Sequence, residues 1–213
     1  AYTRVVGSAI TDALRLDFDR RQAPPDGRRL VIALCAEQGF AGAYSERILD
    51  SVQRGAGPSS TGVLFLVGSR GSVVAEERGW PVAWEAPMVA RSGQAALLAQ
   101  RIARQVYARL AEGGIGEVSV VHGLPDDDAG AGVSAHRLFP VDFRRFPERR
   151  NPHPPLVTMA PETLIARLAE EYVFAMLCEA IVLSFAAENA ARMRAMVGAQ
   201  NNVERRVGEL VDE

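Results

Sequence analysis

The stretch LVIALCAEQGFAGAYSERIL, residues 30–49, decides the predicted fold. It opens with seven consecutive apolar residues, a run that is typical of a strand covered on both faces of a sheet. Gly39 and Gly42 then predict a turn, and Ile48, Leu49 and Val52 share one side of a predicted helix. A strand, a turn and a helix in this order form the building unit of α/β folds.

The same plan returns on the C-terminal side of this stretch. Further predicted strands cover residues 62–68, 80–84 and 117–123, and predicted helices cover residues 69–79 and 92–113. Residues 133–143 alternate apolar and polar side chains, which favours an antiparallel edge strand. We therefore predict a Rossmann-like, layered α/β domain with a mostly parallel sheet over residues 28–142.

A long helix is predicted for residues 161–213, because no proline follows Pro161 and helix-forming residues continue to the end. Such a helix would extend for about 75 Å, several times what a small domain needs. We expect its first half to pack on the domain. The second half, which includes SFAAENAARMRAMVGAQNNVERR (184–206), is predicted to form one strand of a two-helix stalk, with residues 1–18 as the remnant of the other strand and residues 143–160 as a linker.

Composition argues against several classes of protein. The net charge is −2 and every basic residue is arginine, so the basic face of a nucleic-acid-binding protein is not expected. Cys35 and Cys178 form no C-x-x-C pair, and no leader is seen before the first helix, so we expect neither a disulfide framework nor a signal peptide. The most apolar run, 172–187, is shorter than a bilayer requires and contains Glu179, so we predict a buried helix without membrane insertion.

No residue pattern predicts catalysis, a cofactor or a bound metal. VGSRGS (67–72) follows a strand but lacks the dinucleotide fingerprint, so a tight turn is the better interpretation. Asp126, Asp127 and Asp128 lack the spacing of a calcium loop. His122, His136 and His153 lack the spacing of a zinc site.

The C-terminal helix resembles the gamma subunit of F-type ATP synthases, in which A-S-E-x-x-A-R-M-x-A-M-x-x-A-x-x-N is a strong family mark. The matching residues are Ala187, Glu188, Ala191, Arg192, Met193, Ala195, Met196, Ala199 and Asn202. Residues 30–49 are similar to the family's T-S-D-R-G-L-C-G-G-x-N turn, with Gly39 and Gly42 retained. Residues 62–82 are similar to its G-x-K-G strand and helix, with Arg70 in place of lysine. Most of the family's N-terminal helix and its C-terminal tip have no counterpart in this sequence.

This resemblance implies a non-catalytic central-stalk rotor without a cofactor. Its domain would lie at the membrane end, and its antiparallel coiled-coil stalk would thread a ring of alternating alpha and beta subunits, coupling hydrogen ion transport to ATP synthesis or hydrolysis. Stalk contacts are expected from Glu188, Ala191, Arg192, Met193, Ala195, Met196, Ala199 and Asn202. Membrane-end loops that contact the c-ring or an epsilon subunit are expected to contain Glu37, Gln38, Gly39, Gly42 and Asp127. The location implied is the cytoplasmic face of a bacterial inner or plasma membrane, as a peripheral complex subunit.

Three departures from the family pattern indicate a divergent member, for example one from an alternative F-type ATPase operon. The turn at residues 36–43 lacks the usual acidic and basic pair, PLVTMAP (155–161) replaces Y-x-Y-E-P, and His122 and Gly123 replace an asparagine-bearing strand end. Two other functions fit parts of the sequence. The α/β domain could bind a small molecule or nucleotide, or the chain could be a regulatory adaptor that dimerises through its coiled-coil extension.

Overall fold

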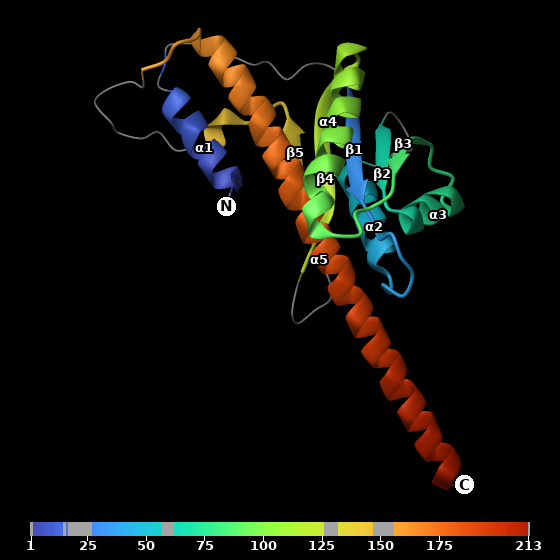
Figure 1. The fold of residues 1–213 in the computed structure, drawn as a ribbon. Coiled ribbons are helices and arrows are strands. Elements are labelled where there is room, and N and C mark those ends of the chain that lie inside the picture. The colour runs from blue at the N-terminus through green and yellow to red at the C-terminus, as the bar shows by residue number, and fades with distance from the viewer. Residues whose placement is uncertain are drawn as a thin grey trace.

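A computed structural model describes residues 2–14, 16, 27–56, 62–125, 132–146 and 156–212. The elements follow in the order α1 (Tyr2–Ala13), β1 (Arg28–Leu34), α2 (Tyr44–Ala56), β2 (Val63–Val67), α3 (Ser69–Glu77), β3 (Val82–Ala86), η1 (Ser92–Gln94), α4 (Ala95–Ala111), β4 (Ile115–Leu124), β5 (Gly132–Phe139), η2 (Phe143–Arg145) and α5 (Pro161–Asp212). Figure 1 shows a layered α/β body from which α5 projects.

The sheet has the order β3-β2-β1-β4-β5. Its first four strands are parallel, and β5 pairs antiparallel with β4 at one edge. The predicted parallel sheet and the antiparallel edge strand are both confirmed. β1 lies at the centre with all of its residues from Leu30 to Leu34 buried, because strands that are covered on both faces require an uninterrupted apolar run.

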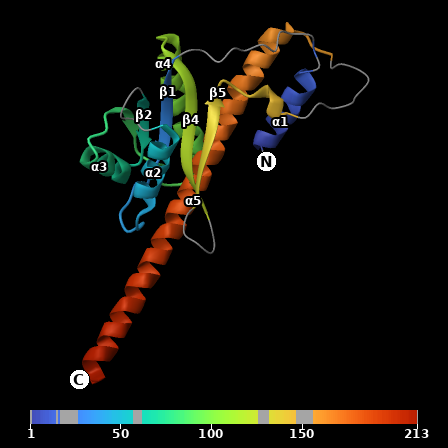
Figure 2. The same cartoon turned by 180° about the vertical axis from the view of Figure 1, so that it is seen from behind.

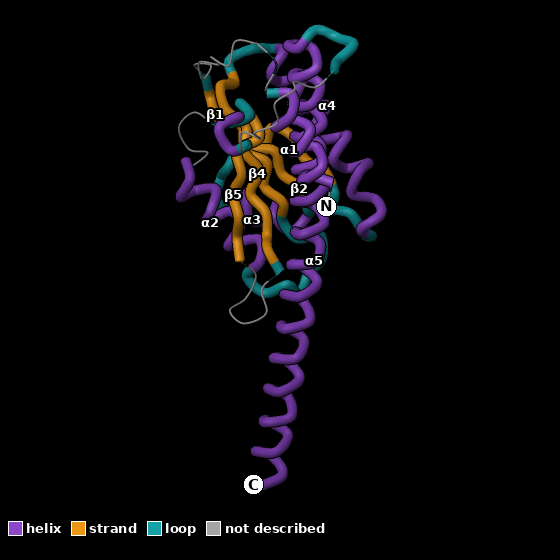
Figure 3. The backbone as a smooth tube through the Cα atoms, turned by 90° about the vertical axis from the view of Figure 1, so that its left-hand side faces the viewer, coloured by secondary structure: helices purple, strands orange, loops and turns teal. Residues whose placement is uncertain are grey.

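Two helices cover each face of the sheet. One core joins α4 and α5 to the sheet through side chains such as Leu98, Ile102, Leu177 and Ile181. The other core joins α2 and α3 to the opposite face through residues such as Ile48, Leu49 and Ala75. The edge-on view in Figure 3 shows the strands between these layers, with α5 extending beyond them.

The helix α5 has two halves with different surroundings. Leu177 and Ile181 are fully buried against the sheet, whereas Met196 and Val203 are 55% and 61% exposed. The first half of α5 therefore packs on the sheet, and the second half extends away from it. By length and composition, one helix among the described residues could cross a membrane, namely residues 161–211, but its apolar centre packs on the sheet as in a buried core helix.

The helix α1 packs beside the start of α5 and runs antiparallel to it (Figures 1 and 2). Val6, Ile10 and Leu14 form a third small core with partly buried Leu168 and Tyr172. The hydroxyl of Thr3 donates to Glu179 at 2.6 Å, and Tyr2 donates to Glu171. The N-terminal end of α1 therefore points along α5 towards its exposed half. Of the predicted stalk remnant 1–18, residues 1, 15, 17 and 18 lie outside the described part.

Candidate functional site

A buried polar contact fixes α5 to the centre of the sheet. Ser184 is fully buried, and its hydroxyl donates to the carbonyl oxygen of Leu34 at 3.1 Å. The Tyr44 hydroxyl lies 2.7 Å from Ser184 Oγ and must be the donor there, because Ser184 has a single hydroxyl proton. Burial raises the pKa of the Tyr44 phenol, so this donor stays protonated. The contact sets the rotation of α5 about its own axis relative to β1.

An ion pair one turn further along α5 holds the loop that follows β1. Glu188 is 4% exposed and forms an ion pair with Arg192. The backbone amide of Gln38 donates to Glu188 Oε1 at 3.2 Å, and Arg192 Nε donates to the carbonyl oxygen of Gly39 at 3.3 Å. We call Tyr44, Ser184, Glu188 and Arg192, with the backbone of residues 38–39, the α5 seam. It lies where α5 leaves the domain.

The α5 seam changes the meaning of several predicted stalk residues. Glu188, Ala191 and Arg192 contact the domain of their own chain, with Ala191 only 6% exposed in the core shared with α2. Beyond them, Ala195 is half-buried, and the other predicted residues are exposed: Met193, Met196, Ala199 and Asn202. Local sequence could not separate these two groups, because the contacts of Glu188 and Arg192 are to residues about 150 positions away.

The predicted membrane-end loops are also placed differently. The loop with Glu37, Gln38, Gly39 and Gly42 lies beside Glu188 and Arg192, at the end from which the exposed half of α5 departs. The loop therefore lies on the stalk side of the domain, which argues against the expected position at the membrane end. The loop lies there because residues that follow parallel strands gather at the carboxyl ends of those strands, and α5 crosses the same end of the sheet. Asp127 lies outside the described residues.

Glu37 fills the position where a phosphate would bind in a nucleotide-binding fold. Its carboxylate accepts from the Ser69 amide at 3.2 Å, the Ser69 hydroxyl at 2.6 Å and the Met88 amide at 2.8 Å. Ser69 begins α3, and amides at a helix N-terminus favour an anion. Here a side chain of the protein supplies that anion. This agrees with the interpretation of VGSRGS as a tight turn.

The exposed half of α5 carries a regular apolar stripe that sequence reasoning missed. We call it the stalk stripe; its members are Met193, Met196, Gln200, Val203, Val207 and Leu210. The spacing alternates between three and four residues, which is the heptad pattern of a coiled coil. Its five apolar members are 54–73% exposed. The 3-4 spacing was readable in the sequence, but the amides and charges between these residues obscured it.

The first part of α5 already pairs with a helix, namely α1. Leu168 and Tyr172, which pack on α1, lie in the same heptad register as Met193 and Met196. Leu168 and Tyr172 face α1, and beyond the domain the stalk stripe faces no helix among the described residues. An exposed apolar row of the length of the stalk stripe indicates a helix-binding surface.

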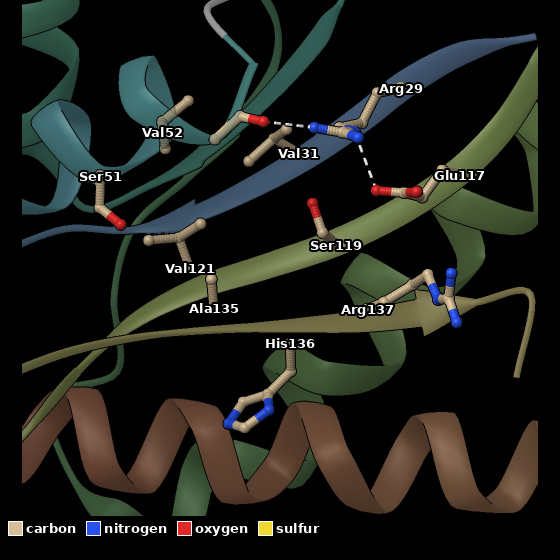
Figure 4. A pocket seen from close by; sticks show the side chains of 11 residues that line it. Arg29, Val31, Ser51, Val52, Glu117, Ser119, Val121, Ala135, His136 and Arg137 are labelled. Atoms are coloured by element: carbon tan, nitrogen blue, oxygen red, sulfur yellow. Dashed lines mark hydrogen bonds and ion pairs between the residues drawn. The ribbon is translucent and has the colours of Figure 1, made fainter. Parts of the chain in front are cut away.

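A shallow hollow of about 230 Å³ opens on the sheet face beside α2 (Figure 4). Val31, Val121 and Ala135 line it, while Arg29 bonds to Glu117 at 2.8 Å and to the carbonyl oxygen of Gly55 at 2.6 Å. These contacts occupy the guanidinium of Arg29, so it offers little to an anionic ligand. Among the described residues, no cluster of three His, Cys, Asp or Glu side chains could hold a metal ion.

Replacing Ser184 by alanine tests the α5 seam. We expect Ser184→Ala to lower the free energy of unfolding by about 1–3 kcal/mol, because the buried Leu34 carbonyl loses its side-chain donor and the Tyr44 hydroxyl keeps only its 3.3 Å contact with the backbone carbonyl of residue 184. Urea denaturation of the purified chain measures the change. The control is Ser72→Ala, which removes an exposed bond to Glu85 and should cost under about 0.5 kcal/mol. Equal losses in both variants would contradict this role.

Comparisons with known proteins point to one family. A sequence model described as ATP synthase matches residues 2–211. The chain is 26% identical over 212 residues to an ATP synthase gamma chain of Parafrankia sp., covering 95% of this chain and 71% of that protein. It is 26% identical over 188 residues to the gamma chain of Ruminococcus albus, covering 85% of this chain and 64% of the relative, which is less than two thirds of its length.

Solved structures share the fold. The central stalk of the mitochondrial ATP synthase of Tetrahymena thermophila aligns with a TM-score of 0.63 at 18% identity, covering 93% of this chain and 94% of that one. A chain of the Euglena gracilis mitochondrial ATP synthase rotor aligns with a TM-score of 0.63 at 12% identity, covering 99% and 90%. The long helix is included in both alignments, because each covers more than nine tenths of this chain.

Proposed function

Because this chain belongs to the ATP synthase gamma-subunit family and is on that ground a rotor subunit, we propose how it performs that role. It couples the turning of an ion-driven membrane ring to ATP synthesis or hydrolysis in a ring of alternating alpha and beta subunits. The exposed half of α5 enters this catalytic ring as one strand of the central stalk. The α/β domain with the first half of α5 forms the body at the other end.

The stalk stripe is the observation that carries this proposal. Heptad-spaced apolar side chains at 54–73% exposure need a partner helix, because an isolated helix gains little stability from propensity alone. The direction of α1 supports an antiparallel partner, since a helix continuing α1 beyond Tyr2 would run along the stripe (Figure 2). Two helices paired this way make a stiff rod that can transmit torque.

The α5 seam connects this rod to the body. Torque on the stalk must pass to the sheet through Ser184, Glu188 and Arg192, which bond to the end of β1 and the following loop. The loop at residues 37–42 therefore faces the catalytic ring. The opposite pole, where α5 begins, faces the membrane ring and an epsilon subunit.

The chain itself performs no chemistry in this proposal. The anion position at α3 is taken by Glu37, so ATP binds to the catalytic ring and not to this domain. The subunit sits at the cytoplasmic face of a bacterial membrane as a peripheral part of the complex.

The second candidate function is an adaptor that dimerises through the stalk stripe. The exposure of the stalk stripe favours this function too. The two candidates differ in what covers Val203. A second copy of the chain would place two stalk stripes against each other, whereas the rotor places an intramolecular helix and the catalytic ring there.

Photocrosslinking in the assembled complex tests the proposal and its polarity. A benzophenone side chain at Val203, which is 61% exposed, should crosslink to alpha or beta subunits, and one at Gln38 should do the same. A benzophenone at Thr163 in the first turn of α5 should crosslink to the membrane ring or epsilon. Crosslinks from Val203 to a second copy of this chain would favour the adaptor. Crosslinks from Gln38 only to the membrane ring would reverse the proposed polarity.

A further inference from the structure

Two histidines meet on the face of the sheet that α5 covers. His122 of β4 is 2% exposed, and its ring stacks on that of His136 of β5, with centroids 5.5 Å apart and planes inclined by 26°. The antiparallel register of β4 and β5 brings them together, because Val120 pairs with His136 and His122 pairs with Ser134. Figure 4 shows the ring of His136 directed towards α5.

Hydrogen bonds define where a proton can be added. His122 Nδ1 lies 2.9 Å from the Gly123 carbonyl oxygen, which only accepts, so Nδ1 carries the proton and Nε2 is the free base. His136 Nε2 lies 2.9 Å from Ser134 Oγ. His122 can therefore gain a proton at Nε2, whereas His136 can gain one at whichever ring nitrogen carries none, because the Ser134 hydroxyl can donate or accept.

Among the described residues, two charged groups act on this pair, one from α5 and one from η2. Glu179 of α5 favours the protonated form of both rings, while Arg145 of η2 opposes protonation of His136. The two rings oppose each other, since two positive charges at this separation repel. From α1, the uncharged Thr3 contacts the same carboxylate, since its hydroxyl donates to Glu179 at 2.6 Å. The pair can therefore hold one proton, and Glu179 is the carboxylate that would balance it.

We propose that His122, His136 and Glu179 form a one-proton switch that couples acidification to the packing of α1 on α5. When both rings are neutral, Glu179 accepts from Thr3 and holds the first turn of α1. When the pair takes up a proton, Glu179 turns towards the imidazolium and releases Thr3. The end of α1 that leads to the stalk stripe then loosens.

The pH range follows from the direction of the shifts. Burial is the main cause that lowers the pKa of both histidines below the ordinary value of about 6.5. A lowered folded-state pKa means that the unfolded chain binds the proton first, so the neutral pair stabilises the fold above pH 6.5. This stabilisation is lost as the pH falls from about 6.5 through the folded pKa. The switch therefore acts in mild acid.

Hydrogen exchange combined with NMR titration of the histidine rings tests the switch in the whole chain. Protection of the amides of residues 6–10, corrected for intrinsic exchange, should fall about tenfold as the pH drops from 7.5 through the folded pKa that the ring titration measures, in step with uptake of one proton by the pair. E179Q should lower the pKa of both rings further and make the protection of α1 low and independent of pH. H136N, which keeps a polar side chain beside Ser134, should also remove the pH dependence.

E171Q is the matched control, because Glu171 also holds α1 through Tyr2 but is not among the groups that influence the histidine pair. It should weaken protection at both pH values, keep the pH dependence and leave the ring titrations unchanged. Equal protection of wild-type α1 above and below the measured pKa of the histidine pair would overturn the proposal. A pH dependence that survives in E179Q would overturn it as well.

Discussion

Gly71→Ala is expected to lower the free energy of unfolding of this chain by about 3 kcal/mol, the upper end of what overpacking a core costs. A Cβ atom at Gly71 would lie 2.4 Å from the Cβ of Cys35 and 2.6 Å from its Sγ. Cys35 cannot move away easily because it is fully buried. The helix α3 cannot move away easily either, because the backbone amide of Arg70 donates to the carbonyl oxygen of Ala36 at 3.0 Å. Glu37 adds a second tie between the same loop and α3.

Gly55→Ala is the matched control for this glycine. Nothing lies within 4 Å of a Cβ atom placed there, and Gly55 sits near the end of α2 without a positive φ. Alanine should therefore leave the stability unchanged or raise it by about 0.5–1 kcal/mol. Urea denaturation followed by circular dichroism measures both variants. A Gly71→Ala midpoint equal to wild type would mean that α3 does not dock on the end of β1.

Val203→Asp is expected to abolish most coupled ATP synthesis while leaving the isolated chain stable. Val203 is 61% exposed in this chain, so a carboxylate there meets water and costs little. In the assembled stalk, a partner helix would cover the position, and an unpaired buried charge costs several kcal/mol. We expect proton-driven ATP synthesis in reconstituted vesicles to fall at least about tenfold, the equivalent of ~1.4 kcal/mol.

Asn201→Asp is the matched control for the stalk stripe, because it makes the same charge change two residues away and off the stripe. It should keep coupling near the wild-type value. Full coupling in Val203→Asp would show that no helix covers the stripe in the working complex. Ala191 is a poor site for such a test, since it is buried in the core of its own domain and a bulky residue there would disturb the sheet as well.

The sequence by itself determined the elements and the family. The apolar run at residues 30–36 predicted a central strand, the alternation after residue 132 predicted the antiparallel edge, and the proline-free C-terminal segment predicted one long helix. These features are local, because burial on one or both sides of an element sets the period of its apolar residues. The polar helix pattern around Glu188 and Arg192 carried the resemblance that the comparisons confirm.

Only the tertiary structure decided which residues of that helix face the domain and which face outwards. Glu188 and Arg192 contact the loop after β1 because α5 crosses the sheet at the carboxyl ends of its parallel strands, where that loop lies. His122 and His136 meet through the register of β4 and β5. Each of these contacts joins segments that are far apart in the sequence. The packing of the layers and the alignment of the strands bring such segments together, and the spacing of residues within one segment does not determine either.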